Sequence, residues 1–560
     1  MRSRLGSCIA DVRPRSLFPP RARKVDRGSI VGKGPHVRAW TTTDRFRMRA
    51  VPMPVIRLAI LLFLLLGFGD SVSAKDAVGG VSAAKVAATT PNMDLVWALL
   101  AGPLVMFMQA GFALLETGLT RAKNAANTMA MNLTMYALAV LGFWALGFAF
   151  QMGGSGLDGF GSMIGLPFLG RSLGVCGLQG FLLAGKGDEP SVLALFLLQA
   201  VFLATAATIP TGALAERWRF ASFVGFGLFI SMFLYPVYAC WVWGGGWLAD
   251  LGASFGIGNG HVDFAGASVV HMTGGLSALA GAIVLGPRIG KFRRDRTARA
   301  IPGHNVPMVA LGTFVLAFGW FGFNCGGAFR AHDVGLARVA VSTMLATASG
   351  CCSALVAMWL IYGKPDPTMA CNGLLAGAVA ISAGCAFVTP LSAVVIGLMA
   401  GLLVIGSILF VERVLCLDDP VGAVSVHGVG GAFGCLCVGL FADGRHGKGW
   451  NGVSGGPLGL FHGGDTGQLL ANMIGVAVNI LWVFPVAWLF FKVMDWTLGN
   501  RVSAQAEIVG LDVAEMGVAG YVQEDPIEVQ RAGLEHLAEH GPGVPRKVGA
   551  PAADESRSRP

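Results

Sequence analysis

Eleven hydrophobic segments, each long enough to cross a lipid bilayer, occupy most of the chain between residues 93 and 494. A bilayer core is about 30 Å thick, so a helix needs about 20 apolar residues to span it. Such segments fold as helices because lipid cannot satisfy the hydrogen-bonding groups of the backbone. We therefore expect an all-α polytopic membrane protein. The expected spans are 93–119, 129–151, 193–214, 220–249, 268–286, 306–326, 339–362, 371–388, 391–411, 424–441 and 468–494.

The composition agrees with lipid as the main solvent of this chain. Hydrophobic residues make up 54% and charged residues 13%, whereas about a quarter of a soluble domain is charged. The basic residues are not interleaved with aromatic residues in a separate domain, which argues against nucleic-acid binding. The sequence has no nucleophile–base pair, phosphate-binding loop or metal cluster. We therefore expect neither an enzyme nor a bound cofactor.

The N-terminal part of the chain differs from the rest. Residues 1–47 are rich in Arg and Pro, which predicts disorder or a non-native extension. A basic start, an apolar run at 56–68 and the sequence Val-Ser-Ala at 72–74 are typical of a secretory signal peptide. We predict that 48–74 is such a peptide and is cleaved, with the mature N-terminus outside; a first membrane anchor is the alternative.

The charges of the loops indicate how the chain is oriented. With an outside start, eleven spans place the C-terminus in the cytoplasm. Loops assigned to the inside then carry twelve Lys and Arg residues, and loops assigned to the outside carry six. This asymmetry follows the positive-inside rule and suits a cell inner membrane. We expect 501–560 to be a cytoplasmic tail that orders against the membrane domain at 501–521 and is disordered at 541–560.

Two stretches of the sequence, 263–275 and 419–431, repeat one pattern. Both read D-x-x-G-A-x-x-V-H-x-x-G-G without a gap, and they lie in the fifth and tenth expected spans. An offset of five spans reverses the direction of the second copy, which is the pattern of a five-plus-five inverted repeat. Such repeats place the substrate path at their interface. We expect the two histidines, His271 and His427, to meet near the middle of the membrane.

Each feature of the repeat has a structural and a functional interpretation. A single buried histidine is most simply a hydrogen-bond partner of a neighbouring helix. Two ionisable residues at matching positions in apolar spans favour a functional pair. A metal site would need a third ligand close by, and the neighbouring turns offer none. Asp263 and Asp419 are expected to cap the helices that follow, with Asp263 also favouring a cation on the outer side, and the Gly-Gly pairs to allow a close helix crossing.

Seven further motifs stand out in the apolar part of the chain. They are A-G-F-A-L-L-E-T-G at 110–118, R-A-K-N at 121–124, G-A-L-A-E-R at 212–217, V-W-G-G-G-W at 242–247, D-F-A-G at 263–266, G-W-F-G-F-N at 319–324 and D-D-P at 418–420. Together they resemble the ammonium transporter, methylammonium permease and Rhesus family, in particular its bacterial ammonium transporter branch. The resemblance covers about 91–522 and implies an eleven-helix transporter domain at 91–500. It also implies a homotrimer with one pore per subunit.

The resemblance also assigns roles to single residues. It implies recruitment of the cation by Trp243, Phe202 and Ala265, through attraction to aromatic faces at the first two. Phe202 and Phe323 would stack as a gate above the histidines, and the residues that flank this region would be Gln199 and Trp320.

Two positions depart from the family pattern at the recruitment site. Gly327 stands where a serine is usual, and Leu198 stands where a phenylalanine is usual. Both changes should weaken ammonium capture or alter discrimination against methylammonium, unless Cys325 or a water supplies the missing polarity. In the tail, G-N-R-V at 499–502 and G-L-D at 510–512 resemble the regulatory segment on which PII-type proteins dock, although Met516 replaces the usual histidine.

The expected function is transport of ammonium. An intact ion is strongly disfavoured in a dry apolar pore, since desolvation still costs several kcal/mol after relaxation. We expect ammonium to lose its proton near the gate and to cross as ammonia, with neutral imidazoles sharing one hydrogen bond. Potassium is excluded because it has no proton to give up. The alternatives are an ammonium sensor that signals through its tail with little flux, and a channel for a neutral gas.

Overall fold

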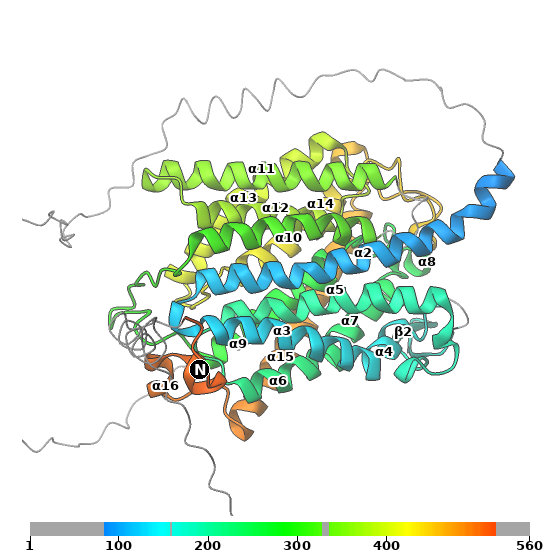
Figure 1. Ribbon diagram of the computed structural model, residues 1–560. Coiled ribbons are helices and arrows are strands. Elements are labelled where there is room, and N and C mark those ends of the chain that lie inside the picture. The colour runs from blue at the N-terminus through cyan, green and yellow to red at the C-terminus, as the bar shows by residue number, and fades with distance from the viewer. Residues whose placement is uncertain (1–82, 157–159, 328–334, 522–560) are drawn as a thin grey trace, which may run out of the picture. The chain divides into compact units, whose positions relative to one another are not determined.

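The computed structural model describes residues 83–156, 160–327 and 335–521 (Figure 1). The expectations for 1–47, for 48–74 and for the tail beyond 521 lie outside these residues. Within them the fold is all-α and polytopic, with one small two-stranded sheet.

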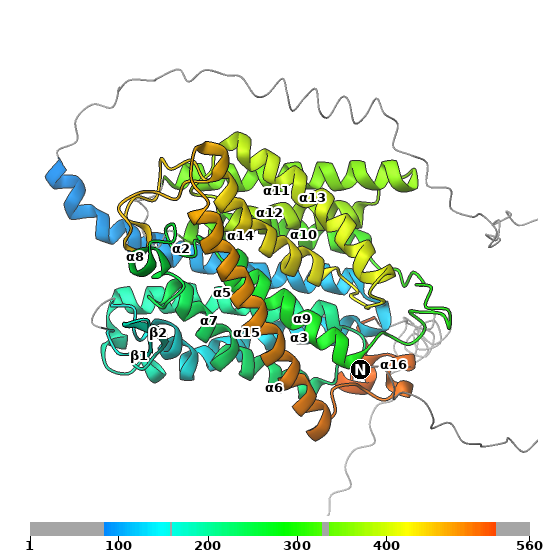
Figure 2. The same ribbon diagram turned by 180° about the vertical axis from the view of Figure 1, so that it is seen from behind.

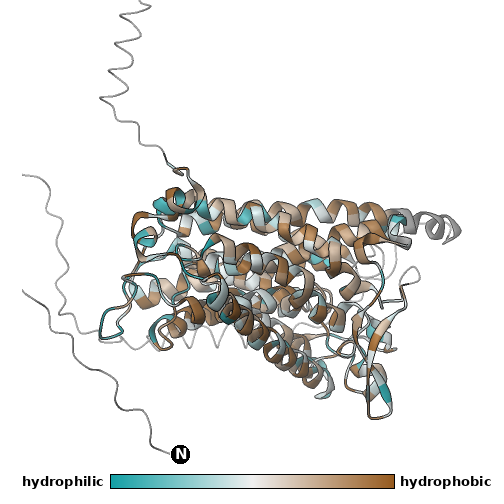
Figure 3. Cartoon of the chain, turned by 90° about the horizontal axis from the view of Figure 1, so that it is seen from below, coloured by the Kyte–Doolittle hydropathy of each residue, from teal (hydrophilic) through white to brown (hydrophobic). Residues whose placement is uncertain are grey.

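Ten helical segments of the described chain are long and apolar enough to cross a membrane. Hydrophobic residues predominate along the helices (Figure 3). Large apolar side chains are exposed on these helices, among them Leu133, Phe314 and Leu481. The helices of these segments are α2 (Ala83–Leu119), α3 (Ala125–Gly142) continued by α4 (Phe148–Met152), α5 (Pro190–Leu214), α6 (Phe220–Phe229) continued by α7 (Tyr235–Trp243), α9 (Thr273–Leu285), α10 (Val306–Gly326), α11 (Leu336–Tyr362), α13 (Pro390–Arg413), α14 (Gly430–Phe441) and α15 (Gly467–Thr497).

The remaining expected span, the eighth in chain order at 371–388, is shorter than predicted and begins earlier. Its helix, α12 (Pro367–Ser382), has 16 residues, about 24 Å at 1.5 Å per residue. The chain leaves the helix after Ser382 because the carbonyls of Ser382 and Ala383 accept hydrogen bonds from the N–H groups of Ala265 and Phe264. The first repeat therefore ends a helix of the second, which no local sequence pattern predicts.

The two copies of the histidine pattern run antiparallel, as expected for an inverted repeat. Helix α9, which continues the first copy, ends at Leu285, and Asp418, the residue before the second copy, pairs with Arg288 just beyond that end. Each copy begins with a π-helical turn, Ala267–Met272 or Val424–Val429, that packs on the helix following the other histidine. The two repeated sequence segments therefore make equivalent packing contacts with each other.

Two of the four repeat glycines make this crossing possible. A Cβ atom on Gly275 would lie 2.2 Å from Gly428 N, and one on Gly431 would lie 2.3 Å from Ala267 O. The expectation of a close crossing holds for these two glycines. It is wrong for the other two, since Gly274 faces α5 and a Cβ on Gly430 would have ordinary room.

The tail lies against one end of the helices, which we call the tail face. Helix α16 (Ala504–Val509) sits there, while the hairpin of β1 (Met163–Phe168) and β2 (Arg171–Gly177) and the short helix α8 (Leu251–Phe255) lie at the opposite face (Figure 2). Arg501 donates hydrogen bonds to the carbonyls of Leu285 and Pro287. Asn127 N–H donates to Asp512 Oδ1 at 2.8 Å, so the tail is attached to α3 as well.

Candidate functional site

The turn that carries His271 is built around a buried carboxylate. Asp263 accepts hydrogen bonds from the N–H groups of Gly266, Ala267, Ser268 and Val269 and from the Ser268 hydroxyl, at 2.7–3.0 Å. These groups would otherwise be the free donors at a helix start. The positive φ of Gly266, 98°, lets the chain turn into the helix. The expected capping role of Asp263 is confirmed, and it orients the segment that leads to His271.

The second copy is capped more sparsely. Asp419 accepts hydrogen bonds from Gly422 N–H at 3.0 Å and Val424 N–H at 2.8 Å. Gly422 has the matching positive φ, 80°. The turn then delivers His427 to the same depth as His271 from the other end.

The two histidines meet in the interior. His271 Nδ1 lies 3.2 Å from His427 Nδ1, and the ring centroids are 5.2 Å apart at an interplanar angle of 30°. His271 is fully buried and His427 is 4% exposed. Because the atoms that meet are both Nδ1, one ring must donate and the other accept. The sequence-based prediction of a facing pair that shares one hydrogen bond is confirmed.

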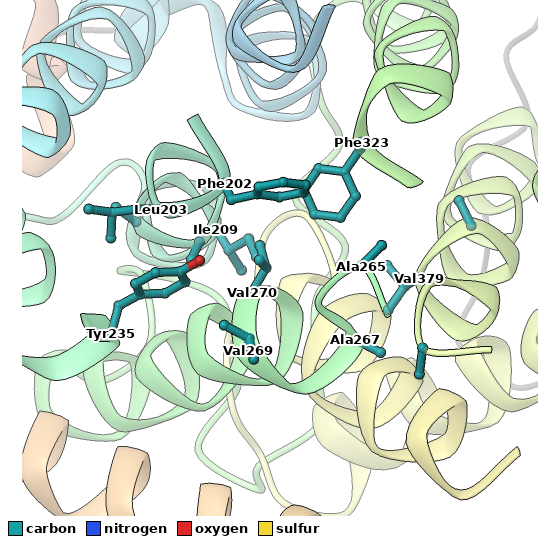
Figure 4. Packing of buried hydrophobic residues seen from close by; sticks show 14 of the residues in the cluster. Phe202, Leu203, Ile209, Tyr235, Ala265, Ala267, Val269, Val270, Phe323 and Val379 are labelled. Atoms are coloured by element: carbon teal, nitrogen blue, oxygen red, sulfur yellow. The ribbon is translucent and has the colours of Figure 1, made fainter. Parts of the chain in front are cut away.

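Aromatic rings lead from the face opposite the tail to this pair. The half-buried Trp243 ring lies 5.7 Å from Phe202, and Trp243 Nε1–H donates to Asp263 O at 2.7 Å. Phe202 and Phe323 lie side by side (Figure 4), with centroids 4.5 Å apart. The expected stack is wrong in its geometry, because the two planes meet at 69°. The buried rings nevertheless close the path above His271.

Two aromatic rings of α10 stack against the imidazole of His271. Trp320 stacks on it at 5.2 Å and 25°, and Phe323 at 5.3 Å and 30°. Trp320 Nε1–H donates to Ser382 Oγ at 3.2 Å, which fixes its ring. Gln199 lies one turn before Phe202 on α5 and accepts from Gln151 Nε2 at 2.6 Å. Trp320 therefore contacts His271 directly, whereas Gln199 is bonded to Gln151.

The two positions that depart from the family pattern, Gly327 and Leu198, are both closely packed. A Cβ atom on Gly327 would lie 2.6 Å from Phe264 O and 3.1 Å from Ala265 Cβ. The site therefore has no room for a serine at this position without a shift of the 264–265 backbone. Leu198 is fully buried, and its side chain lies over Gly326.

The thiol of Cys325 does not replace the missing hydroxyl. Its Sγ approaches Leu336 O, on α11, at 3.8 Å. The thiol is thus directed toward α11, and this part of the expectation is wrong.

Two cavities lie between the histidine pair and the tail face. The cavity beside His427 has a volume of about 10 Å³ and is lined also by Phe112, Glu116 and Asn372. A cavity needs about 10–15 Å³ to hold one water. The larger cavity, of about 460 Å³, is lined by Asp419, Asp366 and Asn372 among others. The passage next to His427 therefore has room for about one water at most, and it widens toward the tail face.

A buried ion cluster at the tail face was not predicted as a unit. Arg288 pairs with Asp418 through two nitrogens, at 2.8 and 3.0 Å, and with Glu216 at 3.1 Å. Arg217 Nη2 donates to Asp418 O at 2.7 Å, and Arg121 also pairs with Glu216. The sequence did hold a signal for this cluster, because its charged residues lie directly beside apolar spans. In the sequence analysis, the charges of the loops were used only to predict the orientation of the chain.

Burial and pairing act in opposite directions within this cluster. Burial lowers the pKa of Arg217 to about 10, although Asp418 acts to raise it. Burial alone would raise the pKa of Asp418, but Arg217 and Arg288 hold it well below its ordinary value. Asp418 is therefore an anion that locks the loops after α5 and α9 to the start of the second histidine segment.

Three buried side chains near the first turn have the composition of a metal site: the ligand atoms of His261, Asp263 and Cys435 lie within 4.8 Å of one another. His261 Nε2 is bonded to Ser268 Oγ at 2.8 Å, and the Asp263 oxygens already accept five hydrogen bonds. A metal would have to displace helix-capping donors. These bonds explain the cluster as support for the turn that carries His271.

Comparisons with known proteins identify the family. The family model described as Ammonium Transporter Family matches residues 96–521. The chain belongs to the ammonium transporter family. Ammonium transporter Amt2 of Archaeoglobus fulgidus is 43% identical over 433 residues, covering 77% of this chain and 88% of the relative. Membership of a transporter family agrees with the expectation that the chain is not an enzyme.

Solved structures of the ammonium transporter family share the fold. One, titled Sensor Amt Protein, has a TM-score of 0.67 and 37% identity, and covers 77% of this chain and 99% of the other. Mep2 of Candida albicans has a TM-score of 0.62 and 27% identity, and covers 73% of this chain and 86% of the other. Both matches support the assignment of a polytopic helical transporter fold.

Proposed function

We propose that this chain transports ammonium: it captures the ion at the face opposite the tail, removes its proton and passes ammonia along the histidine pair. The observation that carries the proposal is the contact between His271 Nδ1 and His427 Nδ1, 3.2 Å apart in the buried interior beside a cavity of only about 10 Å³. Family membership supports the substrate.

Capture is assigned to the aromatic rings at the outer end of the path. Trp243 and Phe202 lie 5.7 Å apart and offer their faces to a cation. Such an attraction contributes about 0.5–2 kcal/mol, more as water is removed. Ala265 belongs to the same wall through its position beside Gly327. Neither Gly327 nor the Cys325 thiol adds a hydroxyl, so recruitment depends mainly on rings.

Loss of the proton follows from the desolvation of the path. Phe202 and Phe323 are fully buried and fill the space above His271. An ion that passes them loses its water, which costs several kcal/mol even after relaxation. Ammonium avoids this cost by giving up a proton, whereas potassium of similar size and charge cannot. Deprotonation therefore provides the selectivity.

The histidine pair suits neutral ammonia. When one Nδ1 donates to the other, the donor ring keeps a lone pair at Nε2 and the acceptor ring carries N–H there. The pair thus presents one acceptor and one donor at its two ends, and His271 Nε2 has no partner within the described part of the protein. Ammonia can donate to one end and accept from the other. The two roles exchange when the shared proton moves between the Nδ1 atoms while one ring loses its Nε2 proton and the other ring gains a proton at Nε2.

The finer assignments extend this proposal. We infer a homotrimer in the cell inner membrane, with a cleaved signal peptide at 48–74, the mature N-terminus outside and the tail face in the cytoplasm. The excess of basic residues in the loops assigned to the inside supports this orientation. The tail packed against α3 and α9 offers a place where a PII-type regulator would act.

The proposal is tested with the full-length protein in liposomes on a solid-supported membrane. A pulse of ammonium chloride should give a transient current in the wild type and in the control His462→Ala, which changes an exposed loop histidine. The double substitution His271→Ala with His427→Ala should abolish it. An unchanged ammonium current in the double variant would falsify the role of the pair.

A sensor with little flux is the second candidate. It is favoured by the likeness to the structure titled Sensor Amt Protein and by the tail, which is bonded directly to the membrane helices. Uptake of labelled methylammonium into the same liposomes separates the two candidates. Accumulation of label supports the transporter, and binding without accumulation supports the sensor.

A further inference from the structure

Glu116 is a buried acid beside the path that the mechanism above does not use. It lies on α2 four residues after Phe112, and therefore on the same helix face, about 6 Å further toward the tail face. The Phe112 ring lies 6.0 Å from the ring of His427. Glu116 is 1% exposed. It is thus the next side chain along α2 after the ring that contacts the histidine pair.

Neutral groups hold the carboxyl in place. Glu116 Oε2 accepts hydrogen bonds from Asn132 Nδ2 on α3 and Thr211 Oγ1 on α5, both at 2.8 Å. Among the described residues Glu116 forms no ion pair; the nearby Glu216 and Asp418 take the arginines instead. An acid without a cation inside a membrane is costly and marks ion or proton paths.

Two cavities link the Glu116 carboxyl to the histidine pair on one side and to the tail face on the other. Glu116 and His427 line the same cavity of about 10 Å³. This cavity shares the wall residues Asn372 and Val421 with the cavity of about 460 Å³, which Asp419 lines. His427 Nδ1 is bonded to His271, so Nε2 is the His427 nitrogen left for a partner in the small cavity. Glu116 is therefore the acid nearest along this route between the pair and the wider space.

We propose that Glu116 carries the proton of each ammonium ion from His427 to the cavity at the tail face. The proposal rests on the transport function proposed above. In the first step an N–H bond of protonated His427 breaks and an O–H bond forms on the Glu116 carboxylate, which leaves a neutral imidazole and a carboxylic acid. In the second step that O–H bond breaks and the proton joins a water of the larger cavity, which restores the carboxylate.

The relay makes transport electrogenic, because ammonia and its proton both reach the tail face. It also explains why the acid has neutral partners. A permanent cation beside Glu116 would oppose the arrival of a proton, whereas Asn132 and Thr211 only orient the oxygen that receives it. The purely structural alternative is that Glu116 ties α2 to α3 and α5. That role needs the hydrogen bonds but not the exchangeable proton.

The decisive variant is Glu116→Gln in the full-length protein, reconstituted in liposomes and given ammonium chloride pulses. The amide keeps the size and an acceptor for Asn132 and Thr211 but cannot carry the proton. We expect the current to fall at least tenfold. The matched control is Thr117→Val, the next residue on α2, whose buried hydroxyl has no partner among the described residues; it should keep the wild-type current. A Glu116→Gln current within twofold of the wild type overturns the relay.

A second measurement does not depend on current. Addition of ammonium chloride should change a carboxylic-acid band in the infrared difference spectrum of the wild type, and Glu116→Gln should lack this change. If Glu116→Gln does not fold, Thr211→Val removes one hydrogen bond to Oε2 and should move the same band. A band that is insensitive to both substitutions overturns the relay. A wild type without any ammonium-dependent current overturns the proposed function, and the relay with it.

Discussion

The two histidine segments share one sequence pattern and have different surroundings. His271 lies under Phe323 and Trp320, behind a start capped by five hydrogen bonds to Asp263. His427 lies against Phe112 and lines a cavity that adjoins a much larger one. The repeat brings the imidazoles together, and what surrounds each one gives the path a direction. In the proposed mechanism, rings strip water from a cation at one end, and polar groups and space receive the products at the other.

The largest expected effect is a loss of stability on substitution of Asp418, in the ion cluster at the tail face. Asp418→Ala leaves the buried Arg288 without its bidentate partner, and breaking such a pair costs about 3–5 kcal/mol. Thermal unfolding in detergent should show a large loss of stability. If the melting temperature is unchanged, the ion cluster does not stabilise the tail-face end of the helices. The structural difference drawn between this end and the end lined by aromatic rings would then be wrong.

The same residue predicts a dependence on pH. The pKa of Asp418 is held below its ordinary value, against the effect of burial, by Arg217 and Arg288. Its stabilisation is therefore complete above the unfolded pKa of about 4 and is lost as pH falls below that value. Melting curves of the wild type should shift downward below about pH 4, and Asp418→Ala should shift less. Equal shifts in the two proteins would exclude Asp418 as the cause.

A smaller loss of stability is expected when either of the two capping carboxylates, Asp263 or Asp419, is removed. Asp263→Ala removes the acceptor of four backbone N–H groups and of the Ser268 hydroxyl, whereas Asp419→Ala removes the acceptor of two N–H groups in this structure. A lost cap costs about 0.5–2 kcal/mol, and further unsatisfied donors add to it. Asp263→Ala should therefore lower the melting temperature more than Asp419→Ala. The reverse order would show that the first turn does not depend on its cap.

The smallest effect concerns capture at the outer rings. Trp243→Leu removes one aromatic face and about 1 kcal/mol of cation attraction, which corresponds to roughly a fivefold rise in the half-saturating ammonium concentration. Phe112→Leu, at the other end, should leave that concentration nearly unchanged. Concentration series of the current measure both. Equal shifts would mean that capture is not confined to the end near Trp243.

The sequence predicted those features that depend on a long-range repeat or a helix start. His271 and His427 were paired because ionisable residues are costly in apolar spans, and their matching positions in two inverted segments favour a shared role. Asp263 was recognised as a cap by its place before the turn. The π-helical turns were not predicted, because a shift of one backbone hydrogen bond leaves no mark on hydrophobic spacing. The end of α12 at Ser382 was missed because the cause is Ala265, more than a hundred residues earlier.

The remaining misses have the same physical origin in contacts between distant segments. The angle between Phe202 and Phe323 is set by packing that no spacing encodes. The room beside Gly327 is taken by the backbone of Phe264. Glu116 stood out only as part of a motif, since its place beside His427 depends on how α2 crosses the second repeat.

Potassium provides the most direct test of deprotonation as the source of selectivity. The wild type, reconstituted in liposomes, should give a current with ammonium chloride, give none with potassium chloride, and keep its ammonium current in a large excess of potassium. A potassium current of comparable size would mean that an intact, desolvated cation passes the rings and the imidazole pair. Proton removal at this constriction would then not be what lets ammonium through.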